Sequence, residues 1–343
     1  MKVKNYICYA SAVACVLLVV VTPSAFAAGQ GETAEEITLY SGRGESLVAP
    51  LIERFEEETG IAVDVRYGDT AELAVLMQEE GDASPADVYW AQDGGALGGV
   101  ARAGLFTRLP EDIAGELPAI FTNETGEWVA TSGRARVLAY HPDRVSSGEM
   151  PSSVFDLTDD AYEGRVGWAP TNGSLQSFVT AMRVMHGDDA TLEWLEGLRA
   201  SGAKTYRNNT AIVEAIAAGE IDMGIVNHYY LLRFLDEDPD YPVEQRFFEA
   251  GDVGNLVNVA GVGILEAATN PDGAERFVRF LLSPEAQQYF TDEVFEYPVI
   301  RDVEQNPNLE SSDTLLEVSP RLDLDELEDL DGTLELLREA GAL

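Results

Sequence analysis

Cysteine is almost absent from this 343-residue chain, and its two copies, Cys8 and Cys15, both fall within the first 30 residues. The sequence beyond them cannot form a disulfide, and zinc or iron–sulfur sites built on thiolates are excluded there. The three histidines are scattered along the chain and do not have the spacing of a zinc site. Stability must therefore come from packing, as expected for a chain long enough to form two domains.

Positive charge is scarce as well. The formal net charge is −39, with 22 Lys and Arg against 61 Asp and Glu, and Lys204 is the only lysine after residue 4. Like charge repels the phosphate backbone and anionic membrane surfaces, which argues against nucleic-acid binding and membrane adhesion. A strongly acidic, halophilic type of surface is expected of a protein that works in high salt, where its charges are screened.

Long apolar runs are missing apart from one near the N-terminus. A short basic start precedes an apolar stretch over residues 10–21, and Ala25 to Ala27 fit the small-x-small pattern of a cleavage site. We expect residues 1–27 to be a signal peptide cut before Ala28, which would place the mature protein in the periplasm. An uncut membrane anchor and a lipid tether on Cys15 stay open as alternatives.

Short apolar strands alternate with amphipathic helices from Ile37 onward, which predicts an α/β fold with a mostly parallel sheet. Two longer strand passages are expected over residues 128–140, interrupted at Ser132-Gly133-Arg134, and over residues 251–264. The acidic stretch 323–331 is expected to be a solvated surface segment. Because no low-complexity linker separates two domains, the chain is expected to cross between its lobes more than once.

Catalytic motifs are missing too. The sequence has no Gly-x-Ser-x-Gly elbow, no Walker loop and no dinucleotide-binding glycine pattern. We therefore expect a binding protein rather than an enzyme, with a secreted α/β hydrolase as a remote alternative. In open α/β sheets, ligands bind where strands end and helices begin. Four loops are expected at such positions, and they cover residues 41–44, 92–95, 170–174 and 227–230.

Tyr229 and Tyr230 follow an apolar strand expected over residues 221–226. Adjacent tyrosines can simply be one core ring beside one surface ring, but at a strand end both hydroxyls can face a cleft. A phenol has an ordinary pKa near 10, and a trivalent cation strongly favours its phenolate form. Phenolate oxygen is a hard donor that suits ferric iron. The pair is therefore the first candidate for metal binding.

Two further features can bind an anion. Asn172-Gly173-Ser174 is either a plain helix N-cap or an anion nest with free backbone N–H groups at a helix start. Arg43 and Arg134 lie in glycine-containing segments of a cation-poor chain. Each can hold a carbonate or phosphate that completes the coordination of a metal, or can form a surface ion pair.

Six short segments, taken together and in their order along the chain, indicate a known family. They are Leu39-Tyr40-Ser41-Gly42-Arg43-Gly44, Pro85-Ala86-Asp87-Val88-Tyr89, Pro170-Thr171-Asn172-Gly173, Gly219-Glu220-Ile221-Asp222, Asn227-His228-Tyr229-Tyr230 and Leu282-Ser283-Pro284-Glu285-Ala286-Gln287. With this ordered set, the chain resembles the periplasmic ferric-ion-binding proteins of ABC iron importers, often called bacterial transferrins. The resemblance runs from about Ile37 to about Val299.

The resemblance implies a two-lobe periplasmic binding protein of type II, with crossing hinge strands and a ligand cleft between the lobes. Residues 36–131 and 258–343 would form the N-terminal lobe, and residues 132–257 the C-terminal lobe. Such a protein is a monomer that captures Fe(III) with a synergistic anion, carbonate (or bicarbonate) or phosphate. It delivers the iron to the membrane subunits of an ABC permease with their ATPase, and catalyses no reaction.

Site residues also follow from the resemblance. Tyr229 and Tyr230 carry over as iron ligands, and the anion-binding loop of the family falls on Asn172-Gly173-Ser174. The cleft asparagines of the family fall on Asn209 and Asn227.

This chain differs from the family pattern at two positions, so the resemblance does not assign the iron ligands beyond the tyrosine pair. Some family members have a histidine where this chain has Gly44, and a glutamate where it has Gln92 followed by Asp93. A third tyrosine, which another branch places near Ser174, is also missing. Asp93 and, more weakly, Tyr140 are further candidates. Another cargo of two-lobe proteins, such as sulfate, phosphonate, thiamine or a polyamine, is the main alternative.

Overall fold

The computed structural model describes residues 35–115, 117–304 and 306–343, so the expected signal peptide over residues 1–27 lies outside the described residues. The strands are β1 (Glu36–Ser41), β2 (Ala62–Tyr67), β3 (Val88–Ala91), β4 (Trp128–Tyr140), β5 (Val166–Trp168), β6 (Lys204–Thr205), β7 (Met223–Asn227), β8 (Glu244–Arg246) and β9 (Val257–Ile264). In this part of the chain, no helix has the length and apolar character needed to cross a membrane.

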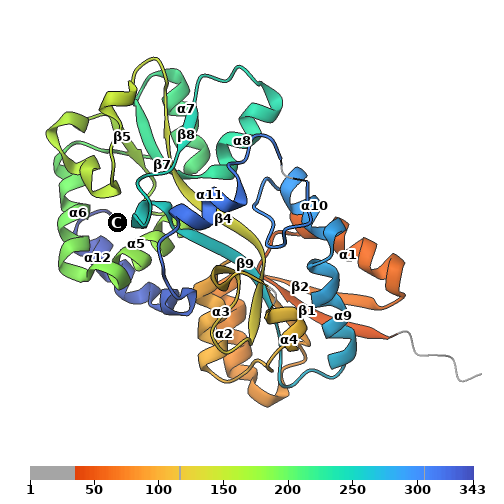
Figure 1. The fold of residues 1–343 in the computed structure, drawn as a ribbon. Helices are drawn as coiled ribbons and strands as arrows, with labels where there is room; N and C mark the ends of the chain where they lie inside the picture. Colours follow the sequence, from red (N-terminus) through yellow and green to blue (C-terminus); the bar gives the residue numbers. More distant parts are fainter. Residues whose placement is uncertain (1–34, 116, 305) are drawn as a thin grey trace, which may run out of the picture. The chain divides into compact units, whose positions relative to one another are not determined.

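Helices cover both sides of the sheet strands (Figure 1). The α-helices are α1 (Glu45–Thr59), α2 (Thr70–Glu80), α3 (Gly94–Arg102), α4 (Glu111–Ala114), α5 (Gly173–His186), α6 (Asp188–Ala200), α7 (Asn209–Ala218), α8 (His228–Glu237), α9 (Pro271–Leu281), α10 (Pro284–Asp292), α11 (Ser312–Val318) and α12 (Leu330–Glu339). The 3₁₀-helices are η1 (Gly81–Ala83), η2 (Ala119–Phe121), η3 (Ser147–Glu149), η4 (Val154–Thr158), η5 (Asp160–Tyr162), η6 (Val253–Asn255) and η7 (Leu324–Glu328).

The strands form one mixed sheet in the order β2-β1-β3-β9-β4-β7-β5-β6, and β8 pairs with β4. The β1/β2, β1/β3, β5/β6 and β5/β7 pairs are parallel, as expected. The β3/β9, β4/β9, β4/β7 and β4/β8 pairs are antiparallel, so the expectation of a mostly parallel sheet is wrong. The reason is that β4 and β9, which run side by side through the middle of the sheet in Figure 1, are long strands of opposite direction.

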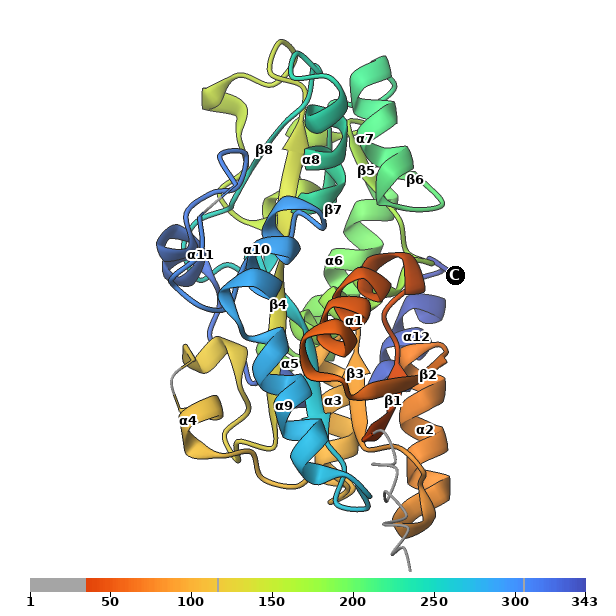
Figure 2. The same ribbon diagram turned by 90° about the vertical axis from the view of Figure 1, so that its right-hand side faces the viewer.

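Strand β4 is not interrupted at Ser132-Gly133-Arg134, in contrast to the expectation, and Figure 2 shows it as one long strand. Its register with β9 shifts between Ala130 and Ser132, so the irregular sequence produces a bulge rather than a break. Gly133 lies where a Cβ atom would be only 3.3 Å from Cβ of Tyr297, with which it forms an antiparallel bridge. The glycine therefore permits a close approach of the chain segment after α10.

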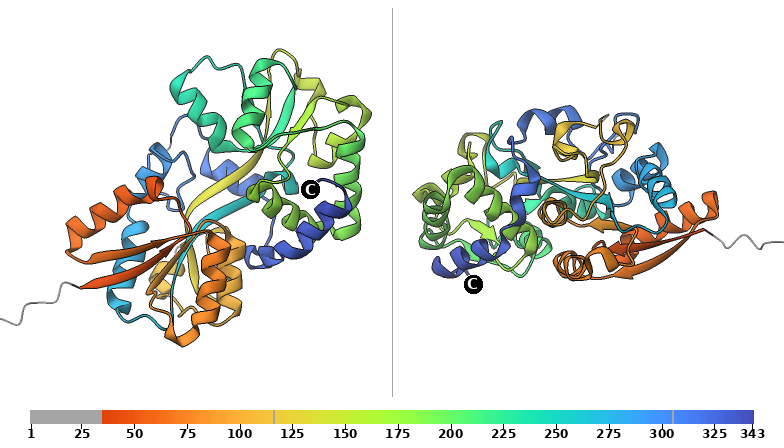
Figure 3. Two further views of the ribbon diagram at one scale, coloured as in Figure 1. Left: turned by 180° about the vertical axis from the view of Figure 1, so that it is seen from behind. Right: turned by 90° about the horizontal axis from the view of Figure 1, so that it is seen from below.

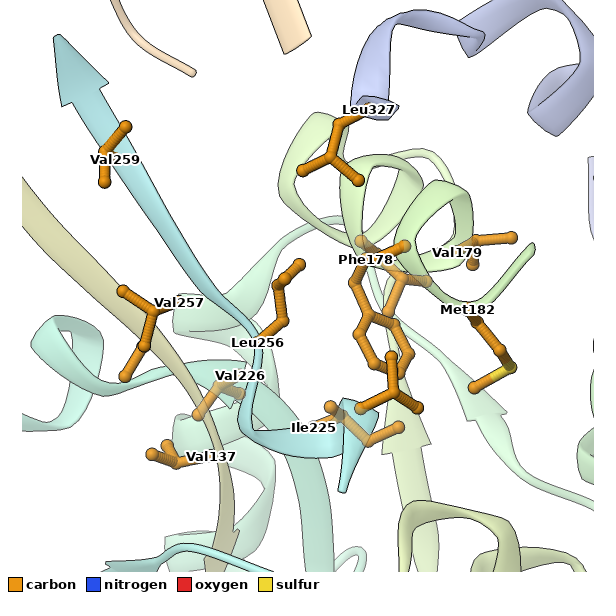
Figure 4. Close-up of a cluster of buried hydrophobic side chains, with 14 of the residues drawn as sticks. Val137, Phe178, Val179, Met182, Ile225, Val226, Leu256, Val257, Val259 and Leu327 are labelled. Atoms are coloured by element: carbon orange, nitrogen blue, oxygen red, sulfur yellow. The ribbon is translucent and has the colours of Figure 1, made fainter. Parts of the chain in front are cut away.

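The buried apolar side chains form two clusters. In one of them, the Phe277 ring lies 5.0 Å from the Phe55 ring and 6.0 Å from the Trp90 ring, edge to face. The other follows α5, β4, β7 and β9. Figure 4 shows part of it, in which Leu327 of η7 points toward Phe178 of α5.

The acidic stretch 323–331 is exposed over most of its length, as expected, but it also has a buried apolar face that was not predicted. Leu324 and Leu327 of η7 are buried, and the Asp325 carboxylate accepts a hydrogen bond from the Trp128 indole N–H at 2.8 Å. The two leucines are three residues apart, so one turn of 3₁₀-helix brings them to the same face. The high charge of the segment concealed this narrow apolar face.

Asp87, which directly precedes β3, forms hydrogen bonds with two neighbouring segments. Its side chain is nearly fully buried, and its carboxylate accepts hydrogen bonds from the backbone N–H groups of Thr38, Thr269 and Asn270 at 2.7, 2.6 and 2.9 Å. One carboxylate therefore satisfies donors from β1 and from the turn that precedes α9.

Asp87→Ala is expected to lower the free energy of unfolding by about 3 kcal/mol, because three backbone donors would lose their acceptor. Asp87→Asn keeps one acceptor oxygen and is expected to cost less. Urea unfolding at one fixed salt concentration would measure both. An Asp87→Ala protein with an unchanged urea midpoint would contradict this role.

Candidate metal- and anion-binding site

A cavity of about 800 Å³ lies where β7 ends and where α3, α5 and α8 begin. The residues predicted from the sequence that line it are Gln92, Asp93, Arg134, Asn172, Gly173, Ser174, Asn227, Tyr229 and Tyr230. Three of the four loops expected at strand ends thus meet at one place. Asn209, Arg43 and Tyr140 were also predicted, but they do not line the cavity.

Tyr229 and Tyr230 lie in the first turn of α8, rather than between strand and helix. Their ring centroids are 4.4 Å apart, and the planes are inclined by 32°. The Asn227 amide donates to the Tyr229 hydroxyl at 3.4 Å, and the Arg233 guanidinium lies over both rings, 5.1 and 5.6 Å from their centroids. Two phenol oxygens are therefore available to one ligand in the cavity.

The phenol of Tyr230 is held in its protonated form. Burial raises the pKa of Tyr230 well above its ordinary value, and the neighbouring Tyr229 raises it further. Arg233 and a hydrogen bond with Asn209 lower this pKa only in part. A neutral phenol at this position needs a strong cation to release its proton.

Arg136 lines the same cavity, although it was not predicted from the sequence. Its guanidinium donates to the backbone carbonyl and the hydroxyl of Ser174, the latter at 3.2 Å, and to the Asn209 side-chain oxygen at 3.4 Å. Burial lowers the pKa of Arg136 to about 10, and the two tyrosines partly offset this effect, so the side chain is a cation at neutral pH. Arg134 and Arg136 are two residues apart on β4 and share one face, a spacing that could have identified Arg136.

Arg134 is almost fully buried and faces Asp93 across the cavity wall. One of its terminal nitrogens donates to the carbonyls of Gln92 and Val259, the latter at 3.0 Å, while its Nε has no hydrogen-bond partner among the described residues. Asp93 is the N-cap of α3 and accepts from the Ala96 N–H at 3.0 Å. Burial raises the pKa of Asp93, and the Ala96 bond and the Arg134 charge offset this only partly.

Asn172 is the N-cap of α5. Its side-chain oxygen accepts from the Ser174 N–H at 3.2 Å, from the Ser174 hydroxyl at 2.5 Å and from the Asn209 amide at 3.1 Å. Asn172 is therefore an N-cap, as expected. A Cβ atom added at Gly173 would meet no atom within 4 Å, so open space lies in front of this helix start. Asn209 supports the loop from behind.

Arg43 forms an ion pair with Glu296. Its guanidinium donates to both carboxylate oxygens of Glu296 at 3.0 Å, and to the Gln92 side-chain oxygen at 3.2 Å. The side chains of Arg43 and Glu296 are 0% and 3% exposed, so the charge of Arg43 is neutralised inside the protein. Its Nε has no hydrogen-bond partner among the described residues, but Arg43 does not line the cavity.

Tyr140 is likewise engaged elsewhere. Its hydroxyl donates to Glu244 at 2.6 Å on the neighbouring strand β8. Burial and this hydrogen bond raise the pKa of Tyr140 to about 12. The weaker ligand candidate is therefore separated from the cavity that holds the tyrosine pair.

His228, the first residue of α8, anchors the tyrosine-bearing turn. The ring is fully buried, its Nδ1 accepts from the Ala135 N–H at 3.1 Å, and its Nε2 donates to the Phe295 carbonyl at 2.8 Å. Burial lowers the pKa of His228 to about 4, so the ring is neutral and both nitrogens are used. The histidine thus fixes α8 against β4 and the segment after α10.

Comparisons with known proteins show which sequences and structures this chain resembles. The sequence profile of the bacterial extracellular solute-binding protein family matches residues 40–288. The major ferric iron-binding protein of Neisseria meningitidis serogroup B is 32% identical over 310 residues, which cover 89% of this chain and 93% of the relative. Iron uptake protein A1 of Synechocystis is 33% identical over 81% of this chain and 79% of the relative.

Two solved structures extend the comparison. Iron-bound HitA from Pseudomonas aeruginosa has a TM-score of 0.79 at 32% identity, covering 90% of this chain and 99% of that one. Trichodesmium IdiA (FutA), solved in complex with iron and citrate ligands, has a TM-score of 0.78 at 28% identity over 89% and 99%. The predicted resemblance and the predicted type II periplasmic binding-protein fold are confirmed.

The pKa of Glu296 lies below its ordinary value. Burial alone would raise the pKa of its carboxyl, but the charges of Arg43 and Arg134, with hydrogen bonds from Arg43 and Ser132, hold it below the ordinary value. A carboxyl with a lowered folded-state pKa contributes stability above its unfolded-state pKa of about 4.3. That contribution is lost as the pH falls through the lower, folded-state pKa.

Glu296→Gln is expected to lower the free energy of unfolding by about 3 kcal/mol near pH 7, because Arg43 would be buried without its counter-charge. The difference from the wild type should begin to shrink as the pH falls below the unfolded-state pKa of about 4.3, and should be lost as the pH falls through the lower, folded-state pKa of Glu296. Urea midpoints measured at pH 7 and at stepwise lower pH would test this. Glu285→Gln, which removes an exposed pair with Arg54, is the matched control, with an expected change within about 0.5 kcal/mol. Equal losses in the two variants would contradict the account.

Proposed function

Because the chain belongs to the bacterial extracellular solute-binding protein family, we propose that it captures ferric iron outside the cytoplasm and delivers it to an ABC permease and its ATPase. The observation that carries the proposal is the placement of Tyr229 and Tyr230 together with Arg134 and Arg136 around one cavity. The names of the relatives, which include ferric iron-binding and iron uptake proteins, support the same cargo. The role is capture and release, without catalysis.

In this proposal, Tyr229 and Tyr230 bind the ion as phenolates. Fe(III) brings three positive charges, and two phenolates compensate two of them. The ion displaces the phenol protons because hard anionic oxygen is the donor that it prefers. Asp93 lies at the cavity wall and is the remaining protein carboxylate that the sequence suggested as a ligand.

A synergistic anion completes the coordination. Two phenolates leave one charge of the ion uncompensated, and Arg134 and Arg136 line the same cavity, as do the carboxylates of Asp69, Asp93, Glu328 and Asp329. Carbonate or phosphate can bind the ion while it accepts hydrogen bonds from the guanidinium groups and from the Asn172-Gly173-Ser174 loop at the start of α5. The unpaired Nε of Arg134 is a donor suited to such an anion.

The mature protein is proposed to begin at Ala28 after export and to work as a periplasmic monomer, with a lipid tether on Cys15 as the alternative. Residues 36–131 with 258–343, and residues 132–257, are proposed as the two lobes that close over the cargo by hinge motion. Closure is favoured only as far as the cargo binds the closed form better than the open one. The permease would then recognise the closed form.

An oxyanion cargo is the second candidate, and one specific observation favours it. The Asn172 loop, Arg134 and Arg136 together form an anion site that does not require a metal. In that case the tyrosines would only be walls of the cavity. The two candidates differ in what happens when the phenol oxygens are removed.

The double variant Tyr229→Phe/Tyr230→Phe is expected to lose ferric binding, because both hard anionic donors are deleted. Metal-free wild-type protein titrated with a ferric salt in bicarbonate should develop a red-orange absorption band, and the variant should not. Tyr140→Phe is the matched control, because its hydroxyl binds Glu244 away from the cavity, and it should keep the band. Binding of sulfate or phosphate that survives in the double variant, with no band in any protein, would favour the oxyanion cargo instead.

The affinity for ferric iron is expected to fall as the pH decreases, because each phenol must release its proton to bind. Two protons released per ion give an affinity that falls about a hundredfold for each pH unit below neutrality. Competition against a chelator of known protonation would measure the slope. Either single Tyr→Phe variant should release one proton and show about a tenfold change per pH unit. An affinity independent of pH would exclude phenolate ligation.

A further inference from the structure

Residues Leu324 to Leu330, which we call the strap, connect α3 to α5. The strap consists of η7, Asp329 and the first residue of α12, and η7 packs against both α3 and α5. Figure 3 (left) shows this dark blue segment between the orange helices, which include α3, and the green helices, which include α5. We propose that the strap limits how far α3 and α5 can separate, and that it thereby slows the escape of cargo from the cavity.

The contact with α3 depends on a groove of glycines. A Cβ atom added at Gly94 would lie 2.7 Å from Cβ of Leu324, and one added at Gly98 would lie 2.5 Å from Cα of Asp325. A Cβ atom at Gly95 would lie 2.4 Å from the Leu327 carbonyl oxygen. Any larger side chain at these positions would displace the backbone of the strap. The glycines thus allow η7 to lie directly on the helix backbone.

Polar contacts hold the strap in this groove. The Trp128 indole N–H donates to Asp325 at 2.8 Å, and the Asn123 amide donates to the same carboxylate at 3.4 Å. Arg102 of α3 pairs with Glu328 at 2.5 Å and donates to the Asp325 carbonyl. The strap is therefore anchored to β4 through a partly buried hydrogen bond and to α3 through an exposed ion pair.

The other end of the strap is anchored on α5. Leu327 is buried in the same apolar cluster as Phe178, toward which it points in Figure 4. Asp329 pairs with Arg183 at 2.9 Å, and the Thr333 hydroxyl in the next turn contacts the Thr180 hydroxyl at 2.8 Å. Helix α12 then packs against α5 and α6. The strap cannot follow α3 without pulling on α5.

The two connected helices both begin at the cavity. Asp93 caps α3 and Asn172 caps α5, and both residues line the cavity, as do Leu327 to Leu330 of the strap itself. Any movement that separates the two caps must withdraw η7 from the glycine groove or unwind it, and both cost packed contacts and hydrogen bonds. The strap therefore opposes opening of the cavity on one side.

The separation can be measured without any cargo. Residues 28–343 contain no cysteine, so spin labels can be attached specifically at Glu79→Cys of α2 and Glu196→Cys of α6, both exposed. We expect Gly98→Ala to shift the label–label distance distribution of the metal-free protein to longer and broader values. Gly99→Ala is the matched control, because a Cβ atom there meets nothing within 4 Å. Identical distributions in the two variants would overturn the proposal.

A second pair of variants tests the consequence for release, which rests on the proposed ferric cargo. Trp128→Phe removes the donor to Asp325, whereas Trp90→Phe removes an equivalent buried indole donor to Thr131 that does not touch the strap. We expect iron transfer to excess EDTA to be about tenfold faster in Trp128→Phe than in Trp90→Phe. Equal rates would contradict the role in release. If no variant binds iron, the proposed cargo is wrong, and the distance measurement still decides whether the strap limits opening.

Discussion

The buried positive charge of Arg134 and Arg136 on β4 is the constraint on which the site depends. Both guanidinium groups border a cavity, and among the described residues neither forms an ion pair of the kind that Arg43 makes with Glu296, although the charge of Arg134 acts on Asp93 and Glu296. Buried charge that lacks a directly paired counter-charge is costly, and this cost favours the anion of the proposed function. The phenol of Tyr230 beside them has a pKa raised by burial, so it is neutral until a strong cation binds. Under the proposed function, metal and anion would therefore assist each other, since each would supply the charge that makes the other favourable.

Strand β4 brings these charges into place. It pairs with β7, β8 and β9, and its Ala135 N–H binds the ring of His228, which begins the helix of the tyrosine pair. The same strand carries Trp128, the donor to the strap. A single long strand thus positions the arginines, the tyrosine-bearing turn and the C-terminal segment relative to one another. Its bulge and Gly133 adjust the register without breaking the strand.

The sequence predicted those parts of the candidate site that depend on residues close together in the chain. Tyr229, Tyr230 and the Asn172 loop were predicted because each lies at a strand end or helix start, and these positions converge in open α/β sheets. Anion binding and an ion pair were both open for Arg43, and no local pattern reveals the pair because Glu296 is 253 residues away in sequence. The buried face of the otherwise exposed acidic segment was not predicted for a related reason, since Leu324 lies against the glycine groove of α3. Arg136 could have been found from its spacing to Arg134.

The central claim is that ferric iron is bound by the oxygens of Tyr229 and Tyr230. Resonance Raman spectra of the iron-loaded protein, excited within its visible band, test this directly when tyrosine is ring-deuterated. The account predicts enhanced phenolate ring modes that shift on deuteration and disappear in the double phenylalanine variant. An iron-loaded wild-type protein whose spectrum shows no tyrosine modes would contradict it.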